Sequence, residues 1–146
     1  NKEIAMQKKI EKIKELAGPW MESIFYSPVS DQQIKDFEMK KNIEIPKSYK
    51  EFLNNTNGAK IFGGDAFFYG IGDSIDFEVN YDFSEGKVPK QLLIVGFYRS
   101  RHVCYDYRYK SFIFYEYEEY DEIEEECMSF STFDEVLDYI IDIAIS

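Results

Sequence analysis

"VSDQQIKDFEMKKNIEIPKSYKEFLNNTNGAKIFG", residues 29–63, carries the start and stop signals of two helices. At its beginning, Ser30 and Gln33 have the spacing of a capping box, in which the two side chains bond each other's free backbone N–H groups. Val29 and Ile34 flank this pair at the spacing of a hydrophobic staple. The pattern predicts a helix from Ser30 to about Lys41.

A second helix is expected to begin at Pro46, because proline suits the first helical position, where no N–H is needed. Three apolar side chains at helical spacing form its predicted buried stripe: Tyr49, Phe52 and Leu53. The pair Asn57-Gly58 can adopt the left-handed conformation that ends many helices, so we interpret it as the C-terminal cap. After this pair the hydrophobic period changes from helical to alternating.

Before this stretch, residues 2–17 predict another helix. Four side chains repeat at helical spacing and give it one apolar side: Met6, Ile10, Ile13 and Ala17. Gly18-Pro19 ends the pattern. The segment is amphipathic and charged, and it lacks the continuous apolar centre of a secretory signal.

The chain after Gly58 predicts short strands, at residues 60–62, 66–69, 75–83, 92–97, 101–107 and 111–117. In the third of these, apolar and polar side chains alternate strictly. That alternation predicts a half-buried strand with five side chains on one face, namely Ile75, Phe77, Val79, Tyr81 and Phe83. From Thr132 the helical spacing returns, which predicts a closing helix capped by Ser131 or Thr132.

These elements define one α+β domain over residues 1–146, with N-terminal helices, a central and largely antiparallel sheet, and a closing C-terminal helix. Hydrophobic residues make up 45% of the chain and aromatic residues 18%, which is enough for a core and too much for intrinsic disorder. No run approaches the roughly 20 apolar residues of a membrane span. The sequence does not predict an oligomeric state.

Negative charge is concentrated in the later part of the chain. The formal net charge is −11 in total, and it divides into +2 for residues 1–50 and −13 for residues 51–146. Such a surface repels nucleic acid and anionic membranes and attracts basic proteins. We therefore expect a basic protein as the partner, and neither nucleic acid nor a membrane.

Residues 111–130, SFIFYEYEEYDEIEEECMSF, contain eight carboxylates, six aromatic rings and no basic residue. The run is interpreted either as a solvated surface that keeps the protein in solution or as a surface for a basic partner. The candidate partner-binding residues are Glu116, Tyr117, Glu118, Glu119, Tyr120, Asp121 and Glu122, together with the earlier acidic group Asp73, Asp76, Glu78 and Asp82.

Catalytic chemistry finds little support. His102, Cys104 and Asp106 would share one face of a strand and are residue types of a thiol-dependent hydrolase, but alternate strand residues lie about 6.6–7 Å apart, too far for direct proton transfer. Two cysteines, Cys104 and Cys127, are too few for a disulfide framework, which favours reduced thiols and the cytoplasm. We expect no metal and no cofactor.

Residues 29–63 resemble the opening signature of the SUKH superfamily: a capped helix, the pair Ile45-Pro46, Tyr49, Phe52-Leu53 and a closing Asn57-Gly58. The later runs LLIVGFYRSRHVCYDYRYKSFIFYEYEE and SFSTFDEVLDYII are similar to the paired strands and closing helix of that family. The predicted strand around residues 76–82 departs from the family, whose middle region is variable.

The resemblance implies a fold without catalysis and, in bacteria, an immunity protein that binds and neutralises a toxin domain of a polymorphic toxin system, very often a nuclease. That is the first hypothesis. The second is a regulatory or scaffolding module of the same fold that binds another protein. The third, from a different class, is a thiol-dependent hydrolase that uses Cys104.

Overall fold

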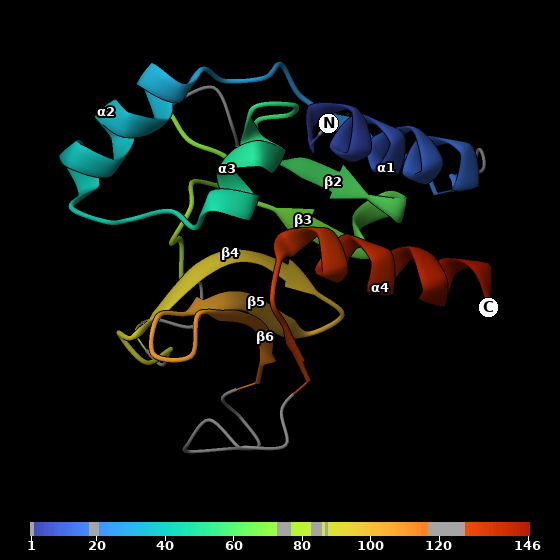
Figure 1. Cartoon of the computed structure of the whole chain (residues 1–146). Coiled ribbons are helices and arrows are strands. Elements are labelled where there is room, and N and C mark those ends of the chain that lie inside the picture. Colours follow the sequence, from blue (N-terminus) through green and yellow to red (C-terminus); the bar gives the residue numbers. More distant parts are fainter. Residues whose placement is uncertain (1, 18–20, 73–76, 83–85, 87, 117–127) are drawn as a thin grey trace.

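The computed structural model describes residues 2–17, 21–72, 77–82, 86, 88–116 and 128–146. The elements follow one another as α1 (Lys2–Leu16), β1 (Ile24–Phe25), α2 (Asp31–Lys41), α3 (Lys47–Leu53), β2 (Ala59–Ile61), the 3-10 turn η1 (Phe62–Gly64), β3 (Ala66–Phe68), β4 (Leu92–Tyr98), β5 (Arg101–Asp106), β6 (Ser111–Tyr115), β7 (Ser129–Phe130) and α4 (Phe133–Ile145) (Figure 1). The predicted order of helices, sheet and closing helix is confirmed.

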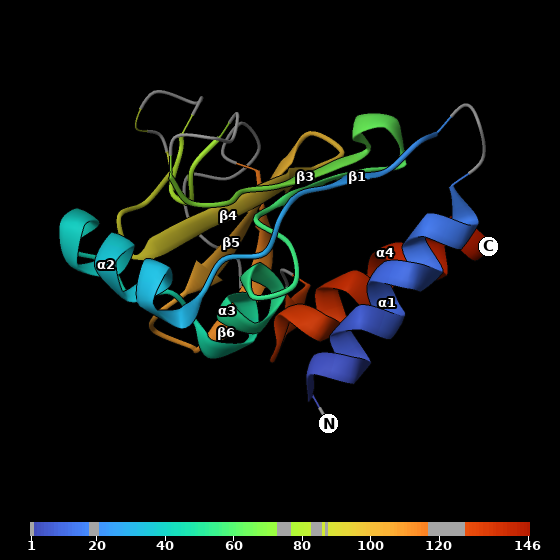
Figure 2. The same ribbon diagram turned by 90° about the horizontal axis from the view of Figure 1, so that it is seen from above.

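Within the described residues the sheet has seven strands, and it is a simple meander in which each strand pairs antiparallel with the next one along the chain. The helices α1, α3 and α4 lie on one side of this sheet, while the described residues 77–82, between β3 and β4, lie over the other side (Figure 2). The two faces of the sheet are therefore covered in different ways: one by helices, the other in part by a loop.

Aromatic rings fill the layer between the sheet and the helices. Phe133, the first residue of α4, has its ring centroid 4.7 Å from that of Tyr49, 4.8 Å from Phe52 and 4.9 Å from Phe68. All four side chains are almost fully buried. The stripe predicted for the second helix (Tyr49, Phe52 and Leu53) is confirmed, and each of its members is 0% exposed.

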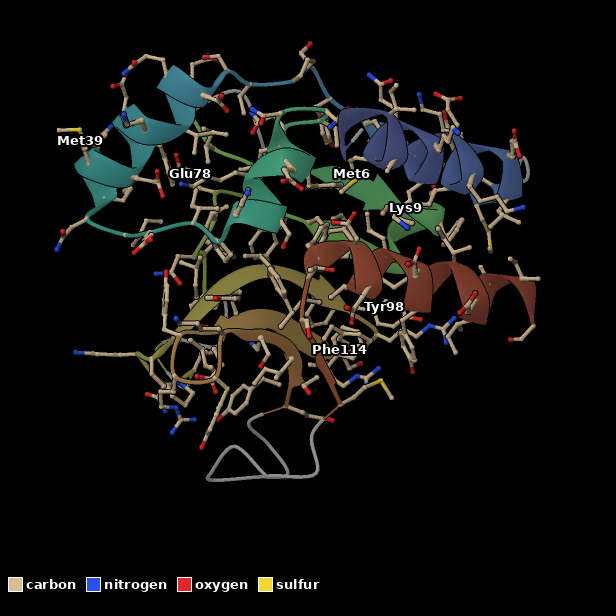
Figure 3. The ribbon with its side chains drawn as sticks, in the orientation of Figure 1. Met6, Lys9, Met39, Glu78, Tyr98 and Phe114 are labelled. Atoms are coloured by element: carbon tan, nitrogen blue, oxygen red, sulfur yellow. The ribbon has the colours of Figure 1, made fainter. Side chains whose placement is uncertain are left out.

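The first helix packs along the last one (Figures 1 and 2). Three of the four side chains in its predicted apolar stripe are buried, with Met6, Ile10 and Ile13 between 0% and 6% exposed. The fourth, Ala17, is half-buried and follows the end of the helix. At the rim of this contact Lys9 Nζ lies 2.6 Å from a carboxylate oxygen of Asp138 in α4; Figure 3 labels Met6 and Lys9. None of the helices in the described part of the chain is long and apolar enough to cross a membrane.

The capping box is present as predicted. Gln33 N donates to Ser30 Oγ at 3.1 Å and Ser30 N donates to Gln33 Oε1 at 2.8 Å. These bonds cap α2, which begins at Asp31 and ends at Lys41. At the other end of the chain the cap of α4 is Thr132, whose hydroxyl accepts a hydrogen bond from Glu135 N.

Two details predicted for the second helix are wrong. Pro46 is the residue before the helix, with an extended ψ of 146°, and α3 begins at Lys47. The helix ends at Leu53 with Asn54 as its cap, so Asn57-Gly58 does not terminate it. The Asn57 side chain instead holds a distant segment: its Nδ2 donates to Ile71 O at 2.8 Å and its Oδ1 accepts from Ile71 N at 2.7 Å.

The half-buried strand predicted for residues 75–83 is wrong where the structure describes that segment. Residues 77–82 form no strand, only an isolated parallel bridge between Glu78 and Gly70. Asn80 takes a positive φ of 74°, and its backbone N–H donates to Ile94 O at 2.7 Å. These bonds bend the segment over the sheet, so that Val79 is buried while Phe77 and Tyr81 face solvent.

Candidate protein-binding surfaces

Three of the predicted partner-binding residues lie in the described part of the chain: Glu78, Asp82 and Glu116. The other eight lie outside the described residues: Asp73, Asp76, Tyr117, Glu118, Glu119, Tyr120, Asp121 and Glu122. Glu78 and Asp82 come from one turn between β3 and β4, and Glu116 directly follows β6. All three side chains are half-buried.

Glu78 has a structural role besides its charge. Its Oε1 lies 3.5 Å from Lys41 Nζ at the end of α2, and its Oε2 accepts a hydrogen bond from Gly72 N at 3.1 Å. The side chain borders an open pocket of about 500 Å³ beside α2, which is also lined by Val29, Gln33, Asp36, Phe37, Lys40, Asn57, Ile71 and Gly72. Glu78 therefore ties the loop to α2 at the edge of this pocket (Figure 3).

Asp82 lies in the segment between β3 and β4. Its Oδ2 accepts a hydrogen bond from Gly86 N at 3.1 Å. Burial lowers the pKa of His102, and the negative charge of Asp82 opposes that change by raising it. The same charge adds to the rise in the pKa of Tyr69 that burial causes. The charge of Asp82 thus acts on Tyr69, which follows β3, and on His102 of β5.

The residues of the hypothetical thiol site do share one face, as predicted, since His102, Cys104 and Asp106 alternate along β5. All three are buried, with Cys104 0% exposed. Burial raises the pKa of the Cys104 thiol well above its ordinary value, and Asp82 and Asp106 raise it further, so the thiol stays protonated at neutral pH. The Asp106 carboxylate is engaged by Arg108, 3.1 Å away.

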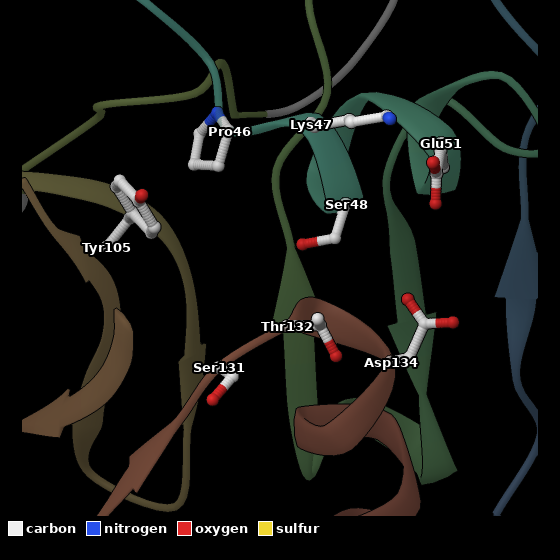
Figure 4. Close-up of a pocket in the computed structure, with 8 residues that line it drawn as sticks. All are labelled: Pro46, Lys47, Ser48, Glu51, Tyr105, Ser131, Thr132 and Asp134. Carbon is white, nitrogen blue, oxygen red and sulfur yellow. The ribbon is translucent and has the colours of Figure 1, made fainter. Parts of the chain in front are cut away.

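A pocket of about 340 Å³ opens where the N-termini of α3 and α4 meet Tyr105 of β5 (Figure 4). Two of its hydroxyl groups accept hydrogen bonds from the backbone of α4. Ser48 Oγ accepts a hydrogen bond from Phe133 N at 2.9 Å, and Thr132 Oγ1 caps α4. Over the described residues, no group of three or more histidine, cysteine, aspartate or glutamate side chains is placed to hold a metal ion.

A set of exposed aromatic side chains was not predicted as a site. Phe77 and Tyr81 are 38% and 43% exposed, and their ring centroids lie 4.9 Å apart. A small hollow beside Phe77 is lined by Tyr26, Phe67 and Tyr69. The alternating sequence around Val79 indicates a row of apolar side chains, but it predicts that Phe77 and Tyr81 are buried on the same face as Val79.

An antiparallel meander with helices packed on one face defines this protein as an α+β domain. Residues 28–135 match the model of the SMI1 / KNR4 family (SUKH-1). The chain therefore belongs to that family, and the resemblance read from residues 29–63 is confirmed. The helix α1 lies outside the matched range, although it contributes to the core.

The chain is also similar to the "Uncharacterized protein YnaB" of Bacillus subtilis (strain 168). The two are 38% identical over 64 residues, which cover 44% of this chain and 44% of YnaB. The matched part of the chain thus covers less than half the length of this curated relative.

Proposed function

We propose that this protein is an immunity protein that binds a cognate protein toxin and neutralises it by covering its surface, without catalysis. The observation that carries the proposal is the match to the SMI1 / KNR4 (SUKH-1) family over residues 28–135, because this superfamily includes many immunity proteins of polymorphic toxin systems. The test is co-expression with the toxin domain encoded by a gene next to this one: cells that make both proteins should grow, and cells that make the toxin alone should not.

The charge of the chain favours a basic toxin. A nuclease needs lysine and arginine side chains where it binds phosphates. An inhibitor with a net charge of −11 is attracted to such a surface from a distance and competes with nucleic acid for it. A nuclease toxin is therefore the partner that we propose, and the cytoplasm, where such a toxin finds its substrate, is the place where the two would meet.

A regulatory or scaffolding module of the same fold is the second candidate. It would bind some protein other than a toxin, so it would not restore growth in the co-expression test. Growth without any physical complex between the two purified proteins would contradict the immunity proposal as well, because neutralisation by covering requires a complex.

The Cys104→Ala variant is expected to protect cells as well as the wild type does, because the Cys104 thiol is fully buried and its raised pKa keeps it protonated. Growth of cells that co-express the toxin domain is the measurement, and a denaturant melt shows whether the variant is folded. A folded Cys104→Ala variant that no longer protects would instead support a thiol-dependent hydrolase.

Replacing Glu118, Glu119 and Glu122 by lysine is expected to slow association with the toxin domain about tenfold or more at low salt, because exposed charges act mainly on the rate of encounter. The association rate is measured by stopped-flow fluorescence at several salt concentrations. Near 1 M salt, where the Debye length is about 3 Å, the rates of the wild type and of the variant should converge.

The matched control reverses three exposed carboxylates of the N-terminal part, Glu11, Glu15 and Glu22, and so changes the net charge by the same amount. A slower association for both variants would assign the effect to net charge alone. An unchanged association rate in a folded Glu118/Glu119/Glu122 variant would assign residues 116–126 to the solvated surface and not to the interface.

A further inference from the structure

The face of the sheet that the helices leave uncovered carries a row of directly paired side chains. Ile24 of β1 pairs with Lys60 of β2, Lys60 pairs with Phe67 of β3, and Phe67 pairs with Phe97 of β4. Ile24 is 40% exposed and the other three are half-buried. Figure 2 shows the helices on the opposite side of these strands. Apart from Lys60, the row is therefore an apolar strip that the helices of the described residues leave uncovered.

Two further rings extend the strip toward the turn between β3 and β4. Phe77 lies with its ring centroid 5.8 Å from that of Tyr69 and 4.9 Å from that of Tyr81. Phe77 also shares a hollow with Phe67 and with Tyr26, which is 38% exposed. We call these four residues, Tyr26, Phe67, Phe77 and Tyr81, the aromatic face.

Backbone hydrogen bonds hold the segment that carries Phe77 and Tyr81, and these bonds add to the contacts between the two rings. Gly70 N donates to Phe77 O at 3.2 Å, and Val79 N donates to Gly70 O at 2.7 Å. Asn80 is bonded twice to Ile94, through its backbone N–H and through its side-chain oxygen. A ring that is presented on a fixed backbone loses little conformational entropy when a partner packs on it, which is the property of an interface anchor.

The charges around the aromatic face indicate which partner it suits. Glu78 and Asp82 directly follow Phe77 and Tyr81 in the chain, and the later part of the sequence is strongly acidic. The ring of Phe67 already carries a cation on its face, since Lys60 Nζ lies 5.8 Å from the ring centroid. Rings bordered by carboxylates bind guanidinium and ammonium groups through cation–π attraction and through the nearby negative charge.

We propose that the aromatic face is the anchor surface for a basic protein, with arginine and lysine side chains of that protein stacked on the rings of Phe77 and Tyr81. The inference rests on the proposed function and adds to it the place of contact. The acidic residues then determine how fast the two proteins meet, and the aromatic face determines how long they stay together.

The test uses the purified toxin domain encoded next to this gene and the double variant Phe77→Ala/Tyr81→Ala. Dissociation should become at least tenfold faster, while association changes by less than about threefold. The matched control is Met39→Ala/Tyr109→Ala, which removes two exposed side chains, 76% and 69% exposed, from α2 and from the turn after β5. That control should dissociate like the wild type.

Each outcome decides one of the two proposals. A wild-type protein that does not bind the toxin domain contradicts the proposed function, and the aromatic-face proposal with it. A wild-type protein that binds, together with a double variant that dissociates equally slowly, overturns the aromatic face alone and leaves the immunity role standing. Sedimentation gives the oligomeric state of the wild type and of the double variant. A dimeric wild type and a monomeric double variant would assign the aromatic face to a second copy of this chain and would also overturn the proposal.

If the double variant unfolds at a lower denaturant concentration than the wild type, Tyr81→Lys is the variant to use. Tyr81 is 43% exposed, so its replacement leaves the core intact, and a lysine there repels a basic partner. The complex should weaken at least tenfold at low salt. An unchanged affinity in this folded variant would contradict the proposal.

Discussion

Phe52→Ala is expected to lower the free energy of unfolding by about 4 kcal/mol, the cost of a large cavity in a packed core. The Phe52 side chain is 0% exposed, and its ring centroid lies 4.8 Å from Phe133 and 5.9 Å from Phe68. It therefore joins α3 to both α4 and β3. Urea denaturation followed by far-ultraviolet circular dichroism gives the free energy of unfolding.

Ser30→Ala is the comparison for this measurement. It removes one helix cap at an exposed position and should cost about 1 kcal/mol. If both variants lose only a small and similar free energy of unfolding, Phe52 does not hold the helices and the sheet together. A loss at Ser30 as large as that at Phe52 would mean that α2 contributes far more to the core than its exposed cap indicates.

Gly70→Ala is expected to destabilise the protein by about 3 kcal/mol, because the added methyl group has no space. A Cβ atom at Gly70 would lie 2.8 Å from the carbonyl carbon of Asn57 and would overlap its carbonyl oxygen. The clash separates Asn57 from Ile71 and breaks the two hydrogen bonds between them. Since Gly70 also bonds Phe77 and Val79, the aromatic face should lose its geometry in the same variant.

Gly72→Ala separates the clash from the general effect of replacing glycine. Gly72 has a φ of +91° but nothing within 4 Å of an added Cβ, so alanine there should cost only about 1 kcal/mol, from the unfavourable φ. Thermal and urea melts of the two variants are compared directly. If Gly70→Ala is no worse than Gly72→Ala, the close approach of residues 57 and 70 is not what holds the loop.

Local signals were enough to predict the helices. The capping box of Ser30 and Gln33, the apolar stripe of α1 and the helical spacing after Thr132 all concern residues within about one turn of each other, and all are confirmed. Five strands of the meander, β2 to β6, also follow from local patterns, whereas the two-residue strands β1 and β7 were not predicted. Of these five, β4, β5 and β6 follow one another with only short turns between them.

Two of the errors arose where a residue bonds a distant segment. Asn57-Gly58 was predicted as a helix cap, yet the Asn57 side chain bonds Ile71, fourteen residues further on. The alternation around Val79 was read as a strand, yet Asn80 is bonded to Ile94 and its φ is positive. In both cases the local sequence is compatible with several structures. The structure that forms depends on a hydrogen-bond partner far along the chain, Ile71 for Asn57 and Ile94 for Asn80, and the neighbouring residues do not identify that partner.

The candidate surfaces also show the difference between what local patterns predict and what distant contacts decide. The sequence alone determined the α+β class, the family and the concentration of negative charge after residue 50, since these depend on composition, spacing and order. Only the tertiary structure decided that Phe77 and Tyr81 face outward while Val79 between them is buried. A period of two places all three on one side of a strand, and the bonds of the turn to Gly70 and Ile94 rotate the two rings out of that plane and onto the open face of the sheet.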